Sequence, residues 1–193
     1  MNPIVDLDEQ ITLAVNSWNT ESLDPFFFYV SYRWLWIGIG AALLFFVFKK
    51  AKPEYKKAVI FLLFLAVAVL AADQICNVVK HSVQRFRPCW DERFMDFVHI
   101  VNNDRGGKYG FFSAHAATFF AIAFLTMKYF QNRKFTVLIY SVAVLVSYSR
   151  IYLGRHYLGD IICGAVEGTL IAWCAYYFYQ KFLGKYMQKH QKN

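Results

Sequence analysis

The sequence lacks the patterns that mark disulfide-bonded, metal-binding and exported soluble proteins. Its four cysteines include no CxxC pair and no spacing typical of metal ligands, so we expect neither a disulfide framework nor a metal or other cofactor. The first ten residues, MNPIVDLDEQ, are acidic and lack the basic start and apolar core of a cleavable signal peptide. Internal repeats and low-complexity linkers are also missing, which favours a single membrane domain over residues 1–193.

Acidic residues are scarce, with 13 Asp and Glu against 21 Lys and Arg, and the imbalance is local. Residues 49–57 carry five lysines and one glutamate, and residues 128–134 carry three basic residues and no acid. The tail from Lys181 to Lys192 also has no acid. These basic residues flank apolar segments and do not line a soluble face, which argues against nucleic-acid binding.

Apolar residues are abundant, at 58% of the chain, with 20 Phe and 13 Tyr among them. Five segments are long enough to span a bilayer, which takes roughly 20 helical residues: 26–48, 57–79, 113–130, 135–153 and 157–179. Residues 3–23 alternate apolar and polar positions at helical spacing, with Asp6 and Glu9 resembling a capping box. The expected fold is an all-α integral membrane helical bundle of about five transmembrane helices plus an N-terminal amphipathic interfacial helix.

The connecting segments predict the orientation of these spans. If five spans alternate in direction, the lysine-rich loops and the C-terminal tail fall on one side, and the acidic N-terminus and residues 81–112 fall on the other. By the positive-inside rule the lysine-rich side is cytoplasmic. We therefore expect a multi-pass protein of the cytoplasmic (inner) membrane, with its C-terminus in the cytoplasm and residues 81–112 on the external or periplasmic side.

Three polar clusters, far apart in sequence, then meet at the external face. The first closes the second span (KHSVQRFRP, 80–88), the second opens the third span (FSAH, 112–115), and the third joins the fourth and fifth spans (SRIYLGRHYLGD, 149–160). Charged side chains at membrane depth are costly and usually mark a functional site. Span counting alone thus predicts one site built from all three clusters.

The residue types indicate phosphate chemistry. Lys80, Arg87 and Arg150 supply more positive charge than the one nearby carboxylate, Asp160, requires, and arginine suits a tetrahedral oxyanion. Ser113 and the first amides of the third helix add neutral donors. His156 and Asp160 are four residues apart, so the carboxylate can fix the imidazole tautomer and leave the second nitrogen free to attack. His115 can then protonate the departing oxygen.

Each element also has a purely structural explanation. Lysine and arginine side chains snorkel at membrane interfaces, and a lone serine at a helix start is commonly a cap. His115 can be a hydrogen-bonded core residue, and Arg150, Arg155 and Asp160 can form an ion-pair network. All of these explanations would have to hold together, at one depth and on four helix ends, which favours the functional site.

The three clusters resemble the signatures of the type 2 phosphatidic acid phosphatase (PAP2) family, which read K-x6-RP, PSGH and SR-x5-H-x3-D. The resemblance covers residues 57–179, which would form the catalytic core. It implies a metal-independent enzyme in which His156 is the nucleophile, Asp160 orients it and His115 is the general acid and base. It also implies phosphate binding by Lys80, Arg87, Ser113, Ala114 and Arg150.

Other polar residues lack a role in these motifs. Phe112 and Ala114 replace the proline and glycine of the second signature, and Ala114 is expected to lose the positive φ that glycine allows. Asp73 and Glu167 lie seven residues from Lys80 and Asp160, so both are expected to face the same interior. They act either on a lipid headgroup or, as the more favoured interpretation, as buried hydrogen-bond partners. Arg155 is expected at the rim as a headgroup contact.

The leading hypothesis is hydrolysis of a phosphomonoester or pyrophosphate on a membrane lipid through a phosphohistidine. Undecaprenyl pyrophosphate, a lipid A phosphate, phosphatidylglycerophosphate and phosphatidic acid are candidate substrates, and family resemblance favours the first two. The alternatives are a phosphatase for soluble esters, a vanadate-binding peroxidase, or a non-catalytic phospholipid-binding or transport protein. The oligomeric state stays open.

Overall fold

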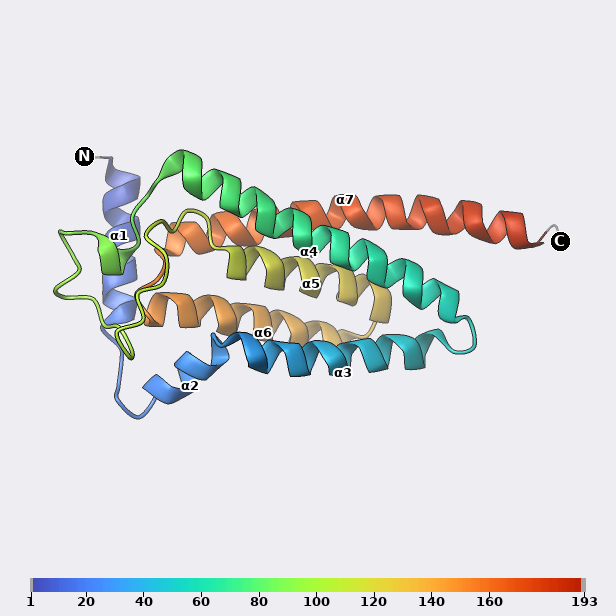
Figure 1. Ribbon diagram of the computed structural model, residues 1–193, viewed down its shortest axis with the longest axis horizontal. Helices are drawn as coiled ribbons and strands as arrows, with labels where there is room; N and C mark the ends of the chain where they lie inside the picture. Colours follow the sequence, from blue (N-terminus) through green and yellow to red (C-terminus); the bar gives the residue numbers. More distant parts are fainter. Residues whose placement is uncertain (1, 192–193) are drawn as a thin grey trace.

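The computed structural model of the chain describes residues 2–191 as a bundle of α-helices (Figure 1). Lys192 of the basic tail lies outside the described residues. Within the described range the helices are α1 (Pro3–Asn16), α2 (Asp24–Val30), α3 (Arg33–Ala51), α4 (Tyr55–Val83), α5 (Ala114–Phe130), α6 (Arg133–Tyr152) and α7 (Leu158–Gln191). Over the same residues the only strand-like pairing is an isolated bridge between Phe86 and Tyr109. The all-α prediction is confirmed.

Helices α3 to α7 run alternately in opposite directions along the long axis of the molecule (Figure 1). Four of them, α3, α4, α6 and α7, are long and apolar enough to cross a membrane. The fifth expected span is α5, whose 17 residues extend about 25 Å and which contacts α4, α6 and α7. The chain is therefore a multi-pass membrane protein with α5 at the centre of its bundle.

The first expected span, 26–48, is wrong as a single helix. The structure divides it into α2 and α3, with Ser31 and Tyr32 leaving the helical path between them. The hydroxyls of Ser31 and Ser149 lie 2.7 Å apart, and the Trp36 indole N–H donates to the freed Val30 carbonyl at 2.6 Å. These contacts satisfy backbone and side-chain groups that a break in an apolar segment would otherwise leave without partners.

The N-terminal helix α1 lies across one end of the bundle (Figure 1). Its polar side, formed by Glu9, Thr12 and Asn16, is buried, whereas apolar residues such as Ile4 remain exposed (76%). The helix begins at Pro3 after an Asn2 cap and ends at Asn16, so the capping box predicted at Asp6 and Glu9 is wrong. Glu9 instead pairs with Arg93, 2.7 Å away. The outward apolar face suits a membrane interface.

Two glycines allow α7 to approach α5 closely. A Cβ atom at Gly164 would lie 2.5 Å from the Ser113 carbonyl oxygen, and one at Gly168 would lie 2.0 Å from that of Ala117. A larger side chain at either position would push the two helices apart. The spacing GAVEG is the small-residue pattern that brings membrane helices into backbone contact. This contact fixes the start of α7 against the start of α5.

The two ends of the bundle differ in how they are held together. At the end we call the tail end, toward the C-terminus, Phe61 of α4 stacks on Tyr129 of α5 with ring centroids 4.2 Å apart. Leu125 and Tyr179 belong to the same apolar cluster. At the opposite end, which we call the loop end, α1 and residues 84–113 cover the starts of α5 and α7 (Figure 1). The polar clusters all lie at the loop end.

Candidate active site

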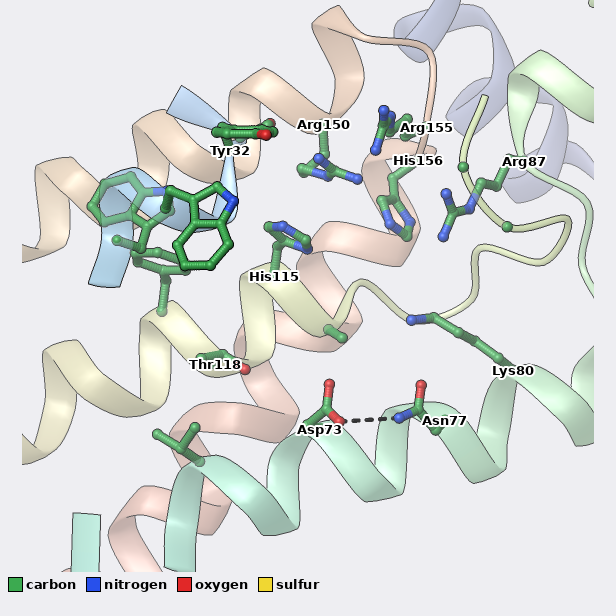
Figure 2. A pocket seen from close by; sticks show the side chains of 18 of the residues that line it. Tyr32, Asp73, Asn77, Lys80, Arg87, His115, Thr118, Arg150, Arg155 and His156 are labelled. Atoms are coloured by element: carbon green, nitrogen blue, oxygen red, sulfur yellow. Dashed lines mark hydrogen bonds between the residues drawn. The ribbon is translucent and has the colours of Figure 1, made fainter. Parts of the chain in front are cut away.

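A tight turn after α6 brings Arg150, Arg155 and His156 to one cavity (Figure 2). The Arg155 amide donates to the Arg150 carbonyl at 2.9 Å, which folds the chain back on itself. Gly154 stands in this turn with φ at +64°, and a Cβ atom there would lie 2.3 Å from Val98 Cγ1. Only glycine fits both the backbone conformation and the space.

His156 and Asp160 form the buried pair that the sequence predicts. Their Nδ1 and Oδ2 atoms are 3.2 Å apart, and Asp160 Oδ2 also accepts the Tyr157 amide at 3.1 Å. With Nδ1 directed at the carboxylate, the Nε2 atom of the ring is left for the cavity. Burial lowers the pKa of His156 well below its usual value of 6.5, and the positive charges of Arg87, Arg150 and Lys80 add to this effect. The imidazole is therefore neutral, the form in which it is a nucleophile.

A third residue, Arg85, holds the other oxygen of Asp160. Arg85 Nη1 donates to Asp160 Oδ1 at 2.9 Å, and Nη2 donates to Asp8 Oδ2 at 2.7 Å. The guanidinium also lies over the Tyr157 ring, 4.0 Å from its centroid. Asp160 is fully buried, so its charge needs such a partner.

Helix α1 completes this support from outside the motifs. Asp8 Oδ1 accepts the Gly159 amide at 2.7 Å, and Thr12 Oγ1 accepts the Leu158 amide at 2.9 Å. Both amides belong to the first turn of α7, where helical N–H groups have no intrahelical partner. Sequence reasoning missed Asp8, Thr12 and Arg85, because no local pattern shows that α1 crosses the start of α7.

The cationic side of the cavity is formed by Lys80, Arg87, Arg150 and Arg155 (Figure 2). Arg87 Nε donates to the Tyr109 carbonyl at 3.1 Å, and Arg155 pairs with Asp104. Arg150 is 2% exposed, and its Nε and Nη1 atoms have no hydrogen-bond partner among residues 2–191. A buried guanidinium with free donors facing a cavity indicates a site for an anion.

His115 and Ala114 enter the same cavity from the first turn of α5. Ala114 has a helical backbone without a positive φ, so the conformation found here does not need the glycine of the second signature. Ser113 is fully buried and does not line the cavity; its hydroxyl accepts the Ala116 amide at 3.4 Å as the cap of α5. Its own amide donates to the Asp160 carbonyl at 2.9 Å, which ties α5 to α7.

The two carboxylates within the spans do not share an interior, contrary to expectation. Asp73 lines the cavity and accepts a hydrogen bond from Asn77 Nδ2 at 3.0 Å (Figure 2). Glu167 lies outside the cavity, where the Cys76 thiol is 3.9 Å from its Oε2 atom. The seven-residue spacing along each helix does not show which neighbour a residue meets. Arg155, expected at the rim, lines the cavity.

The cavity has a volume of about 920 Å³ and three chemically different walls. The cations and both histidines form the first, and polar residues of α4 and α5 form the second. The third is apolar and aromatic: Trp34, Trp36, Ile37, Val69 and Phe119. Within residues 2–191 no group of three or more His, Cys, Asp or Glu side chains is arranged to hold a metal ion. The walls fit an anion joined to an apolar body.

Comparison with known proteins agrees with this description. A family model described as the PAP2 superfamily matches residues 57–183. A lipid A 4'-phosphatase of Porphyromonas gingivalis is 37% identical over 184 residues, which cover 93% of this chain and 75% of that protein. A lipid A 4'-phosphatase of Bacteroides thetaiotaomicron is 33% identical over 182 residues, covering 93% and 80%.

A solved structure has the same fold. The crystal structure of a transmembrane PAP2-type phosphatidylglycerolphosphate phosphatase from Bacillus subtilis matches with a TM-score of 0.67 and 21% identity. The match covers 94% of this chain and 88% of that one.

Proposed function

The chain belongs to the PAP2 superfamily, and on that premise we propose that it hydrolyses a phosphomonoester of a membrane lipid by way of a phosphohistidine. One observation carries the proposal: the buried guanidinium of Arg150, whose Nε and Nη1 atoms have no hydrogen-bond partner among residues 2–191, lines the same cavity as His156 and His115. The apolar wall of this cavity is suited to the acyl part of a lipid. In this proposal residues 57–179 form the catalytic core of a single domain, and α1 supports it.

The proposed reaction has two steps. His156 Nε2 attacks phosphorus while the bond to the lipid oxygen breaks, and His115 donates a proton to that oxygen. His115 then removes a proton from water, whose oxygen attacks phosphorus as the P–N bond breaks. Asp160 keeps the Nδ1–H of His156 in place and stabilises the positive charge that develops on the ring.

The cations stabilise the charge on the transferring phosphoryl group. Lys80, Arg87 and Arg150 line the same cavity as His156, and the amide of Ala114, at the first position of α5, has no intrahelical partner. Ser113 contributes by capping α5 and not by touching phosphate. No step of this mechanism uses a metal ion.

We further propose that the loop end faces the exterior or periplasm and that the chain lies in the inner membrane with its C-terminus in the cytoplasm. The lysine-rich loops support this orientation. The two relatives named lipid A 4'-phosphatases favour a lipid A phosphate over undecaprenyl pyrophosphate, phosphatidylglycerophosphate or phosphatidic acid.

Phosphate release by the purified protein in detergent tests the proposal. Release from a lipid phosphomonoester should continue in EDTA and fall at least about 10³-fold in His156→Ala. Equal release by this variant, or a strict need for added divalent metal, would contradict the mechanism. Tight binding of a lipid phosphate without turnover would instead support a non-catalytic binding protein, and faster turnover of soluble esters than of lipids would support the soluble-substrate alternative.

A further inference from the structure

The cavity contains one carboxylate that a phosphate site does not need. Asp73 lies seven residues before Lys80 on α4, about 10 Å deeper along the helix, and both line the cavity. Asp73 Oδ2 accepts hydrogen bonds from Asn77 Nδ2 at 3.0 Å and Gln74 Nε2 at 3.3 Å. No ion pair to Asp73 is found in the part of the chain that the structure describes. A carboxylate repels phosphate, so Asp73 is suited to another part of a ligand in this cavity.

Two neighbouring side chains also present unused polar atoms. Asn77 donates to Asp73 through Nδ2, which leaves its Oδ1 as an acceptor. Thr118 lines the cavity from α5, and its hydroxyl has no hydrogen bond within residues 2–191. Thr126 and Thr169, by contrast, donate to the carbonyl four residues earlier, both at 2.7 Å. Thr118 is therefore free to bind a ligand.

The order of residues along α4 indicates which part of a lipid meets these groups. Lys80, Asn77, Asp73 and Val69 share one helix face and all line the cavity. From the loop end toward the middle of the bundle, this face presents first a cation, then an amide, then a carboxylate and finally an apolar side chain. On α5, His115 lies at the phosphate site, and Thr118 lines the cavity one helical turn deeper. Along α4, the amide and the carboxylate therefore lie between Lys80 and the apolar Val69, and Figure 2 shows Asp73, Asn77 and Thr118 below His115 in this view.

We propose that Asp73, Asn77 and Thr118 form a subsite for hydroxyl and amide N–H groups of the alcohol that carries the phosphate. The inference rests on the proposed function and narrows its substrate to a phosphorylated lipid with a donor-rich, sugar-like headgroup. A carboxylate accepts hydrogen bonds from such donors more strongly than a neutral group does. A headgroup without donors would desolvate the Asp73 carboxylate without giving it a new hydrogen bond, which costs binding energy and gives selectivity.

A graded set of substrates tests the subsite. Phosphatidic acid has no free hydroxyl beside its phosphate, phosphatidylglycerophosphate has one on its headgroup glycerol, and a lipid A 4'-phosphate has hydroxyl and amide donors on its sugars. We expect kcat/KM to rise along this series in the unaltered protein. In Asp73→Asn the ratio of kcat/KM for the lipid A phosphate to that for phosphatidic acid should fall about tenfold, as for one lost hydrogen bond to a charged group.

Two further variants keep the test decisive. Glu167→Gln neutralises the other carboxylate within the spans, which does not line the cavity, and should leave the ratio as it is. Thr118→Val retains the shape of the side chain and should also lower the ratio of the two kcat/KM values. It provides the test if Asp73→Asn does not fold. An unchanged ratio in folded Asp73→Asn and Thr118→Val, or a preference of the unaltered protein for phosphatidic acid, would overturn the subsite. If the unaltered protein releases phosphate from none of the three lipids, the proposed function is overturned instead.

Discussion

The loop end and the tail end of the bundle are stabilised by different kinds of contact. At the loop end a chain of directional bonds runs from Asp8 through Arg85 to Asp160 and His156, with each contact between 2.7 and 3.2 Å. At the tail end, Phe61 and Tyr129 stack within an apolar cluster. Directional bonds fix the orientation of catalytic groups, whereas apolar packing fixes the spacing of helices. Changes at the loop end should therefore alter turnover, and changes at the tail end should alter stability.

After loss of the nucleophile itself, replacement of Arg150 at the loop end should have the largest effect on turnover. Arg150→Met removes the buried, unpartnered guanidinium and should lower kcat/KM about 10²- to 10³-fold, the usual loss for one donor to a transition-state oxyanion. Arg133→Met, an exposed arginine at the opposite end of the same helix, should leave turnover as it is. Steady-state kinetics on a lipid phosphomonoester compares the two. Equal losses in both variants would break the distinction between the ends.

Replacement of Arg85 should have the next largest effect on turnover. Arg85 is a positioning residue that does not line the cavity. Arg85→Met frees Asp160 Oδ1 and should lower kcat about 10²-fold through misplacement of His156, with little change in KM. Arg85→Lys keeps the charge and should restore part of the loss. A rise in KM with unchanged kcat would show that Arg85 acts on substrate binding instead.

The pH dependence of kcat/KM tests the electrostatics of the loop end. His156 faces Asp160 together with Arg87, Arg150, Lys80 and His115, and the low pKa keeps it neutral and active below pH 6.5. The acid limb of the profile should therefore lie below 6.5. Because Arg87→Gln removes a positive charge, the pKa of His156 should rise and the limb should move to higher pH. A limb that stays in place would show that His156 does not control it.

The smallest effect on turnover is expected at the tail end. Phe61→Ala leaves a cavity beside Tyr129 and should cost about 3 kcal/mol of stability, while kcat measured well below the unfolding midpoint should hardly change. Thermal unfolding in detergent and phosphate release on the same preparation check both parts. A large loss of kcat with unchanged stability would mean that the two ends are coupled.

The sequence alone predicts much of this arrangement. Counting spans was enough to bring Lys80, Arg87, His115 and His156 to one face, because the direction of a membrane helix follows from its order in the chain. The break at Ser31 and Tyr32 could not be predicted, since it depends on contacts with Ser149 and on an indole bond to Val30.

The support of the site was also beyond sequence reasoning. Arg85 stands inside a recognisable motif, yet its partners Asp8 and Asp160 are 77 and 75 residues away. Glu167 shows a similar problem, because its neighbour Cys76 on α4 is 91 residues away in the sequence. Side chains that act through distant elements are visible only once those elements have been assembled.

The most direct test of the central claim is to trap the intermediate. The purified protein is mixed with a ³²P-labelled lipid phosphomonoester, quenched in alkali within milliseconds, digested and mapped by peptide. The account predicts an alkali-stable, acid-labile label on the peptide that contains His156, and no label in His156→Ala. A label on another residue, or labelling that persists in His156→Ala, would contradict it.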